Sequence, residues 1–135
     1  MPERSTGKVF VSYSEHDRNW AREFASVLRE RGVDVWFDAS ELGPGESWRD
    51  AIADALRESR AMVLVLSAGA LGSRWMSFEL GAAVADNKRI IPVLVNDVWM
   101  EDLPPVVSRY QVLRESSPQV AGERVAEVLS KLDAA

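Results

Sequence analysis

The sequence predicts an α/β fold in which a doubly wound, parallel, five-stranded sheet carries helices on both faces. Short β-branched and aromatic runs alternate along the chain with segments of helical periodicity, the pattern of repeated strand–helix–strand units. Two of the runs are almost wholly apolar, as in parallel strands that are covered on both sides. The links are mostly short, so right-handed crossovers are expected to return successive strands to one sheet.

Five segments are expected to form these strands. Residues 9–13 (VFVSY) and 33–37 (VDVWF) are rich in β-branched and aromatic side chains, whereas 61–66 (AMVLVL) and 90–95 (IIPVLV) are the nearly continuous apolar runs. A weaker fifth strand is expected near 110–113. In such sheets ligands bind beyond the carboxyl ends of the strands, where the strand order reverses.

The first helix has clear start and stop signals. It opens at Ser14 with Asp17 three residues later, which is a capping-box pattern, and Gly32 ends it. We therefore interpret Ser14 and Asp17 as helix-capping groups rather than catalytic ones, and His16 as a surface residue. The apolar positions of this helix are Trp20, Phe24, Val27 and Leu28.

Three further segments have the apolar spacing of amphipathic helices. One opens at Ser47, another holds residues 73–84 and stops near Asn87, and the last covers about 119–132. The apolar positions of the last helix are Val120, Val125, Val128, Leu129 and Leu132.

Composition excludes several classes of function. The 135 residues fit one domain at 8–135, preceded by a short flexible tail at 1–7. The net charge of −5 offers no basic stripe for nucleic acid. No apolar run approaches the ~20 residues of a membrane span, and the N-terminus has no signal-peptide core. With no cysteine and one histidine, His16, thiolate metal sites and cysteine nucleophiles are excluded. We expect a cytoplasmic domain that binds neither nucleic acid nor membrane and holds no metal.

Glu79 is the residue that fits its predicted helix least. The stretch SRWMSFELGAAV places Trp75, Phe78 and Ala82 on one apolar face, with Glu79 in its middle. Two interpretations stay open on the residues alone. The carboxylate reaches solvent or pairs with an arginine such as Arg74, or it is a partly desolvated group held beside the indole for chemistry.

The link DASELGPGES, residues 38–47, is also unusual. It is longer than the roughly two to six residues that usually join a strand to a helix, and long loops are more often functional. Gly43 and Gly45 permit positive φ, and Pro44 stiffens the middle. It matches neither common phosphate-binding glycine motif. A response-regulator receiver is excluded because the third strand ends in Ser67, where that family needs an aspartate.

Five stretches together resemble the TIR (Toll/interleukin-receptor/resistance) domain, from Val9 to about Leu132. They are VFVSYSEHD, VWFDASELGPGESW, VLVLSAGALGSRW, the W-x-x-x-E formed by Trp75 and Glu79, and RIIPVLV. The resemblance implies a flavodoxin-like α/β domain. Some members are protein–protein adaptors, and others cleave NAD at the bond between nicotinamide and ribose.

The resemblance also implies roles for individual residues. The NAD-cleaving members place their essential glutamate where Glu79 stands, four residues after a tryptophan, so Glu79 is expected to be catalytic. The residues expected to bind substrate are Ser12, Tyr13, Ser14, Asp38, Ser67 and Trp75. The loop that contains Leu42, Gly43, Pro44 and Gly45 is expected to contact a neighbouring copy. Glu15 departs from members that carry a basic residue near that point, and Arg18 or Arg74 could make the pyrophosphate contacts instead.

The function expected from this resemblance is that of a bacterial-type NAD+ glycohydrolase or cyclase, activated by self-association, in defence or virulence signalling. NAD+ is the substrate, and no further cofactor is needed. One carboxylate suffices, because nicotinamide leaves as a neutral molecule and the carboxylate stabilises the oxocarbenium-like ribose. The alternative is a non-catalytic TIR interaction module, although adaptor members commonly lack the glutamate. A nucleoside deoxyribosyltransferase-like enzyme is a third interpretation.

Overall fold

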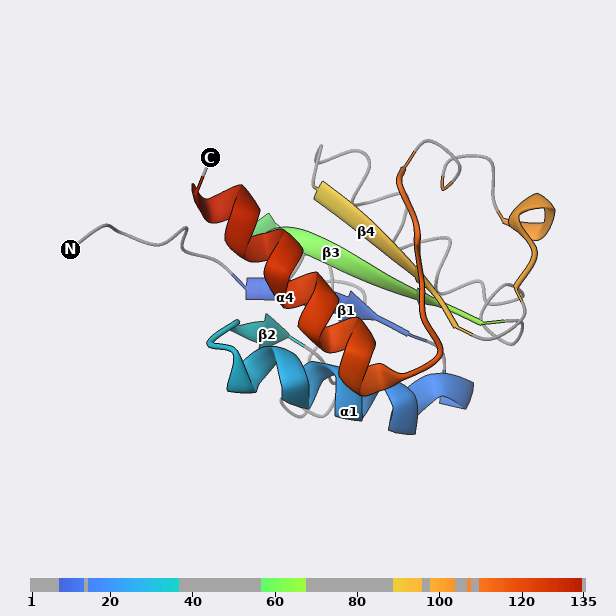
Figure 1. Cartoon of the computed structure of the whole chain (residues 1–135), viewed down its shortest axis with the longest axis horizontal. Helices are drawn as coiled ribbons and strands as arrows, with labels where there is room; N and C mark the ends of the chain where they lie inside the picture. Colours follow the sequence, from blue (N-terminus) through green and yellow to red (C-terminus); the bar gives the residue numbers. More distant parts are fainter. Residues whose placement is uncertain are drawn as a thin grey trace, which may run out of the picture.

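The computed structural model describes residues 8–13, 15–36, 57–67, 89–95, 98–103, 107 and 110–134. In this part of the chain five strands form one parallel sheet in the order β2-β1-β3-β4-β5. Figure 1 labels β1, β2, β3 and β4. The strands are β1 (Lys8–Ser12), β2 (Val35–Trp36), β3 (Ser59–Leu66), β4 (Arg89–Leu94) and β5 (Leu113–Arg114). The predicted strands are confirmed, with ends that differ by up to a few residues.

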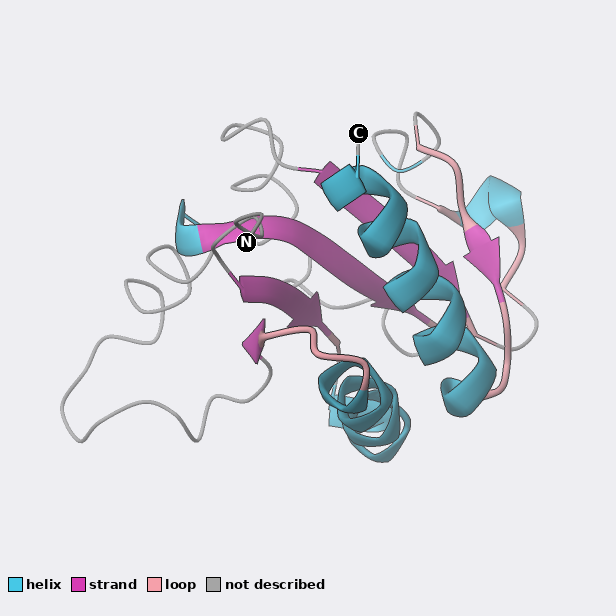
Figure 2. Ribbon diagram, turned by 60° about the vertical axis from the view of Figure 1, so that its left-hand side comes forward, coloured by secondary structure: helices cyan, strands magenta, loops and turns pink. Residues whose placement is uncertain are grey.

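Two long helices, α1 (Arg18–Glu30) and α4 (Pro118–Ala134), lie side by side on one face of the sheet (Figures 1 and 2). Short 3-10 helices, η1 (Glu15–Asp17) and η4 (Met100–Asp102), lie in connections. The helices predicted from Ser47 and over 73–84 fall outside the described residues. No helix in the described ranges is long and apolar enough to cross a membrane.

The core follows from the alternation of side chains along each strand. Val9, Val11 and Tyr13 point to the side of the sheet that α1 and α4 cover, where they join one buried apolar cluster. The intervening side chains of β1 and β3 are buried as well; these are Phe10, Met62, Leu64 and Leu66. Both faces of the sheet are therefore buried, as its nearly continuous apolar strands predict.

The start of α1 differs from the prediction, whereas its end agrees with it. Asp17 is the N-cap residue of α1, and its side chain makes no capping hydrogen bond there, whereas the sequence placed the helix start at Ser14. The predicted capping box pairs Asp17 with Ser14 and therefore stays a prediction. Ser14 lies outside the described residues. At the other end, Gly32 has a φ of 83°, a conformation that glycine adopts without steric cost and that commonly ends helices.

Helix α4 is buried through only part of the apolar set that its spacing predicted. Val125 and Leu129 are buried as expected, whereas Val120 and Val128 are 38% and 42% exposed. Gly122 lies against α1, where an added Cβ would be 2.7 Å from the Cβ of Val27. The absence of a side chain at Gly122 therefore lets the two helices approach closely at this point.

Candidate active site

The strand order reverses between β1 and β3, which lie next to each other in the sheet. The chain leaves β1 toward β2 on one side and leaves β3 toward β4 on the other. In a flavodoxin-like sheet this switch point is where ligands bind, beyond the carboxyl ends of the two strands. Ser12, Tyr13 and Ser67, three of the residues expected to bind substrate, come from these two strand ends.

Ser12 and Tyr13 point to opposite sides of the sheet, since consecutive strand residues alternate. Tyr13 is 9% exposed and belongs to the apolar cluster under α1 and α4. Ser12 is 1% exposed and follows Phe10 on the other side, where the ring of Phe10 stacks on Trp36 with centroids 4.7 Å apart. The two residues therefore face different environments at the end of β1.

A short hydrogen bond joins Ser67 to the connection between β1 and α1. The hydroxyl of Ser67 donates to Oδ2 of Asp17 over 2.5 Å, within the short range of bonds between a hydroxyl and a carboxylate. Ser67 is 7% exposed, and Asp17 is half-buried. The bond connects the residue after β3 to the residue before α1, fifty positions apart in the sequence.

Asp17 is a residue of this site that the sequence did not lead us to predict, because its position three residues after Ser14 was interpreted as helix capping. The signal that could have found it is topological. Asp17 closely follows β1 and Ser67 directly follows β3, and these parallel strands are neighbours whose carboxyl ends meet at one edge.

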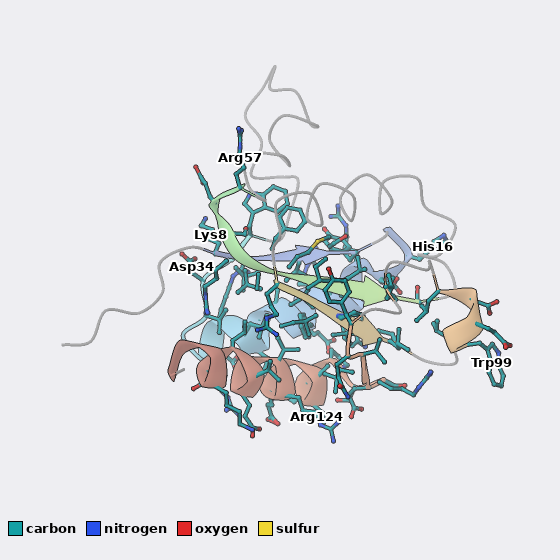
Figure 3. The ribbon with its side chains drawn as sticks, turned by 90° about the horizontal axis from the view of Figure 1, so that it is seen from above. Lys8, His16, Asp34, Arg57, Trp99 and Arg124 are labelled. Atoms are coloured by element: carbon teal, nitrogen blue, oxygen red, sulfur yellow. The ribbon has the colours of Figure 1, made fainter. Side chains whose placement is uncertain are left out.

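The same edge carries His16 and Trp99, which Figure 3 shows at the end of the sheet opposite to Lys8, Asp34 and Arg57. His16 is exposed, as predicted. Trp99 is 67% exposed and directly precedes η4. Within the described ranges, no group of three or more acidic or histidine side chains could hold a metal ion.

The remaining predicted site residues fall outside the described part of the chain. They are Glu79, Trp75, Asp38 and Ser14, together with Leu42, Gly43, Pro44 and Gly45 of the predicted assembly loop. Their roles stay predictions. The part of the candidate site that the structure describes therefore consists of the carboxyl ends of β1 and β3 and the hydrogen bond between Ser67 and Asp17.

Comparison with known proteins shows which family model the chain matches. The family model described as "TIR domain" matches residues 9–127, which is nearly the whole chain. Among solved structures, that of a metazoan TIR-STING receptor from C. gigas, in complex with 2',3'-cGAMP, aligns with a TM-score of 0.81 and 26% identity. The alignment covers 96% of this chain and 41% of that one.

Several curated relatives have names that describe enzymes. A probable 2' cyclic ADP-D-ribose synthase of Methanobrevibacter olleyae is 25% identical over 93% of this chain and 38% of its own length. An NAD(+) hydrolase of a Theionarchaea archaeon is 33% identical over 70% of this chain and 30% of its own length. The chain spans between 25% and 38% of the length of the first curated relatives it matches.

Proposed function

The chain belongs to the TIR domain family, and on that premise we propose that it cleaves NAD+ at the bond between nicotinamide and ribose. One observation carries the proposal. The W-x-x-x-E of Trp75 and Glu79 lies in a chain that is similar to proteins named as an NAD(+) hydrolase and a cyclic ADP-D-ribose synthase. The edge between β1 and β3 supports it, because that edge is the expected ligand position in this sheet order.

The chemistry needs few groups from the protein. When the glycosidic bond breaks, its electron pair returns to the ring nitrogen of the pyridinium, so nicotinamide leaves neutral without a proton from an acid. The ribose becomes oxocarbenium-like, and we assign to Glu79 the carboxylate that stabilises this positive charge through the ribose hydroxyls. Attack by water then gives ADP-ribose and a proton, whereas attack by a group of the same molecule gives a cyclic product and a proton.

Assembly through the 38–46 loop is part of the proposal. The loop is longer than a strand–helix link needs, and it combines a stiff residue, Pro44, with the permissive Gly43 and Gly45. Such a segment suits two discrete positions rather than one fixed turn. Contact with a second copy would select the position that completes the site, so that activity depends on association. We place this activity in the cytoplasm, in bacterial defence or virulence signalling.

The test is incubation of the concentrated protein with NAD+, followed by chromatography of nicotinamide and of the ADP-ribose products. We expect nicotinamide release with a specific activity that rises with protein concentration or with a crowding agent. Pro44→Ala is expected to flatten this rise while leaving the melting temperature nearly unchanged. A specific activity that stays constant over a hundredfold dilution would contradict assembly control, even where NAD+ is cleaved.

The second candidate function is a non-catalytic interaction module. The structural similarity to the TIR part of a metazoan TIR-STING receptor favours it. The same experiment separates the two candidates when light scattering is recorded in parallel. Self-association without nicotinamide release at any protein concentration is the result expected of an interaction module, and it would contradict the enzyme.

A further inference from the structure

The geometry points to Asp17 as a positioning residue that acts through Ser67, and this inference depends on the proposed function. By holding the hydroxyl of Ser67, the Asp17 carboxylate fixes the point where the chain leaves β3 relative to the point where it leaves β1. The chain that continues from Ser67 carries Trp75 and Glu79. Asp17 would therefore set the position of the catalytic segment without touching the substrate.

The carboxylate is held on a rigid element. Asp17 directly precedes α1, whose Phe24 and Leu28 are completely buried under the sheet. The ring of Trp20 stacks on Phe24 with centroids 5.4 Å apart, and its indole N–H donates to the carbonyl of Ser116 over 2.8 Å. The first turn of α1 is thus fixed both to the core and to the connection before α4, so a bond from Asp17 can restrain what it contacts.

Ser67 is the residue that such a restraint has to reach. It is the first residue after β3, and it is nearly buried at the edge where β3 lies beside β1. The backbone of β3 pairs with β4 up to Leu66, and the Val95 N–H donates to the Leu66 carbonyl over 2.8 Å. Beyond that point, the hydroxyl of Ser67 ties the exiting chain to the β1 side of the switch point.

The hydrogen bonding of the Asp17 side chain supports a positioning role. An aspartate at an N-cap ordinarily accepts a hydrogen bond from a backbone N–H in the first turn of its helix. Asp17 makes no such bond, and its Oδ2 accepts from Ser67 instead. The side chain therefore takes part in the link between the end of β3 and the connection from β1 to α1.

The test compares Asp17→Ala, Asp17→Asn and Ser67→Ala with the double variant that combines both alanines, measuring kcat and KM for NAD+ separately. We expect Asp17→Ala to lower kcat about 10- to 100-fold, because small displacements of catalytic groups have effects of this size, while KM changes less than about threefold. Asp17→Asn keeps an acceptor for Ser67 and should recover much of the loss. The double variant should lose no more than the more affected single variant, since each alanine removes the hydrogen bond that the two residues share.

The matched control is Trp20→Phe, which removes a different long-range hydrogen bond near the start of α1. We expect it to lower the melting temperature but not kcat, because the buried Phe24 and Leu28 still hold α1 against the sheet and the bond from Asp17 to Ser67 stays. The proposal is overturned when kcat falls in both Asp17→Ala and Trp20→Phe in proportion to their losses of stability. It is also overturned when the fold-losses in kcat of Asp17→Ala and Ser67→Ala multiply in the double variant.

Hydrogen exchange separates this proposal from the proposed function. If the wild-type protein releases no nicotinamide, the proposed function fails, and the positioning role is decided by amide exchange alone. Faster exchange in the peptide that contains Ser67 in Asp17→Ala, but not in Trp20→Phe, would support the role. Equal exchange in the two variants would overturn it.

Discussion

The face of the sheet under α1 and α4 is closed by apolar side chains, whereas its carboxyl edge between β1 and β3 is joined by a hydroxyl and a carboxylate. One strand supplies both regions. Val11 of β1 is buried against the helices, and β1 ends in Ser12, from which the chain runs on to Asp17.

The difference shows how stability and geometry are divided in this domain. Apolar burial is non-directional and scales with the area removed from water, so the helical face contributes mainly to the free energy of unfolding. A short hydrogen bond to a charged group is directional, so the edge fixes where chain segments lie. Substitutions in the two regions should therefore change different measured quantities.

The largest expected change in stability comes from the helical face. Phe24 is 0% exposed and belongs to the apolar cluster between the sheet and the helices. Phe24→Ala should lower the free energy of unfolding by about 3–5 kcal/mol, because it removes buried area and leaves a cavity. Denaturant unfolding measures this loss. A loss below about 0.5 kcal/mol, the size seen for ordinary surface changes, would contradict the assignment of this face to stability.

The largest expected change in activity comes from Glu79. Glu79→Gln should lower kcat by at least about 100-fold, since it removes the charge expected to stabilise the transition state. Glutamine keeps the shape and the hydrogen-bonding capacity, so the melting temperature should stay within a few degrees of the wild-type value. Full activity in this variant would exclude Glu79 as the catalytic carboxylate.

A smaller effect on stability is expected where α1 and α4 meet. Gly122→Ala would place a Cβ 2.7 Å from both Cβ and Cγ1 of Val27 and 3.3 Å from the carbonyl oxygen of Phe24. Overpacking should exceed the gain in helix propensity and lower stability by about 1–2 kcal/mol. The control is Ser130→Ala on the exposed side of α4, which should change stability by less than about 0.5 kcal/mol. Equal stability of Gly122→Ala and wild type would show that α4 can move away from α1.

The smallest effect is expected on the outer side of α4. Val128 is 42% exposed, whereas Val125 on the same helix is 0% exposed. Val128→Thr should change the free energy of unfolding by less than about 0.5 kcal/mol, while Val125→Thr should cost about 1–3 kcal/mol because it buries a hydroxyl. If the two substitutions cost the same, Val128 is covered in solution, and light scattering of the protein would then show association.

The sequence predicted the elements whose signals are local. The strands are recognisable because β-branched and apolar runs are bounded by polar residues, and the observed β1, β3 and β4 coincide with those runs. Gly32 ends α1 because no other residue adopts its positive φ as readily. Trp75 and Glu79 were assigned to the site from the resemblance to TIR domains, which also depends only on the sequence, and their roles stay predictions.

The tertiary structure decided what depends on contacts between distant segments. The helical period shows that α4 is amphipathic but not how it is rotated, and the close approach at Gly122 leaves Val120 and Val128 exposed. In the same way, the sequence places Asp17 three residues after Ser14 in a capping pattern, and only the folded chain shows that its carboxylate accepts a hydrogen bond from Ser67, because β1 and β3 end side by side. A local pattern specifies what a side chain could contact, and only the folded chain brings one of those partners within the 2.5 Å of this bond.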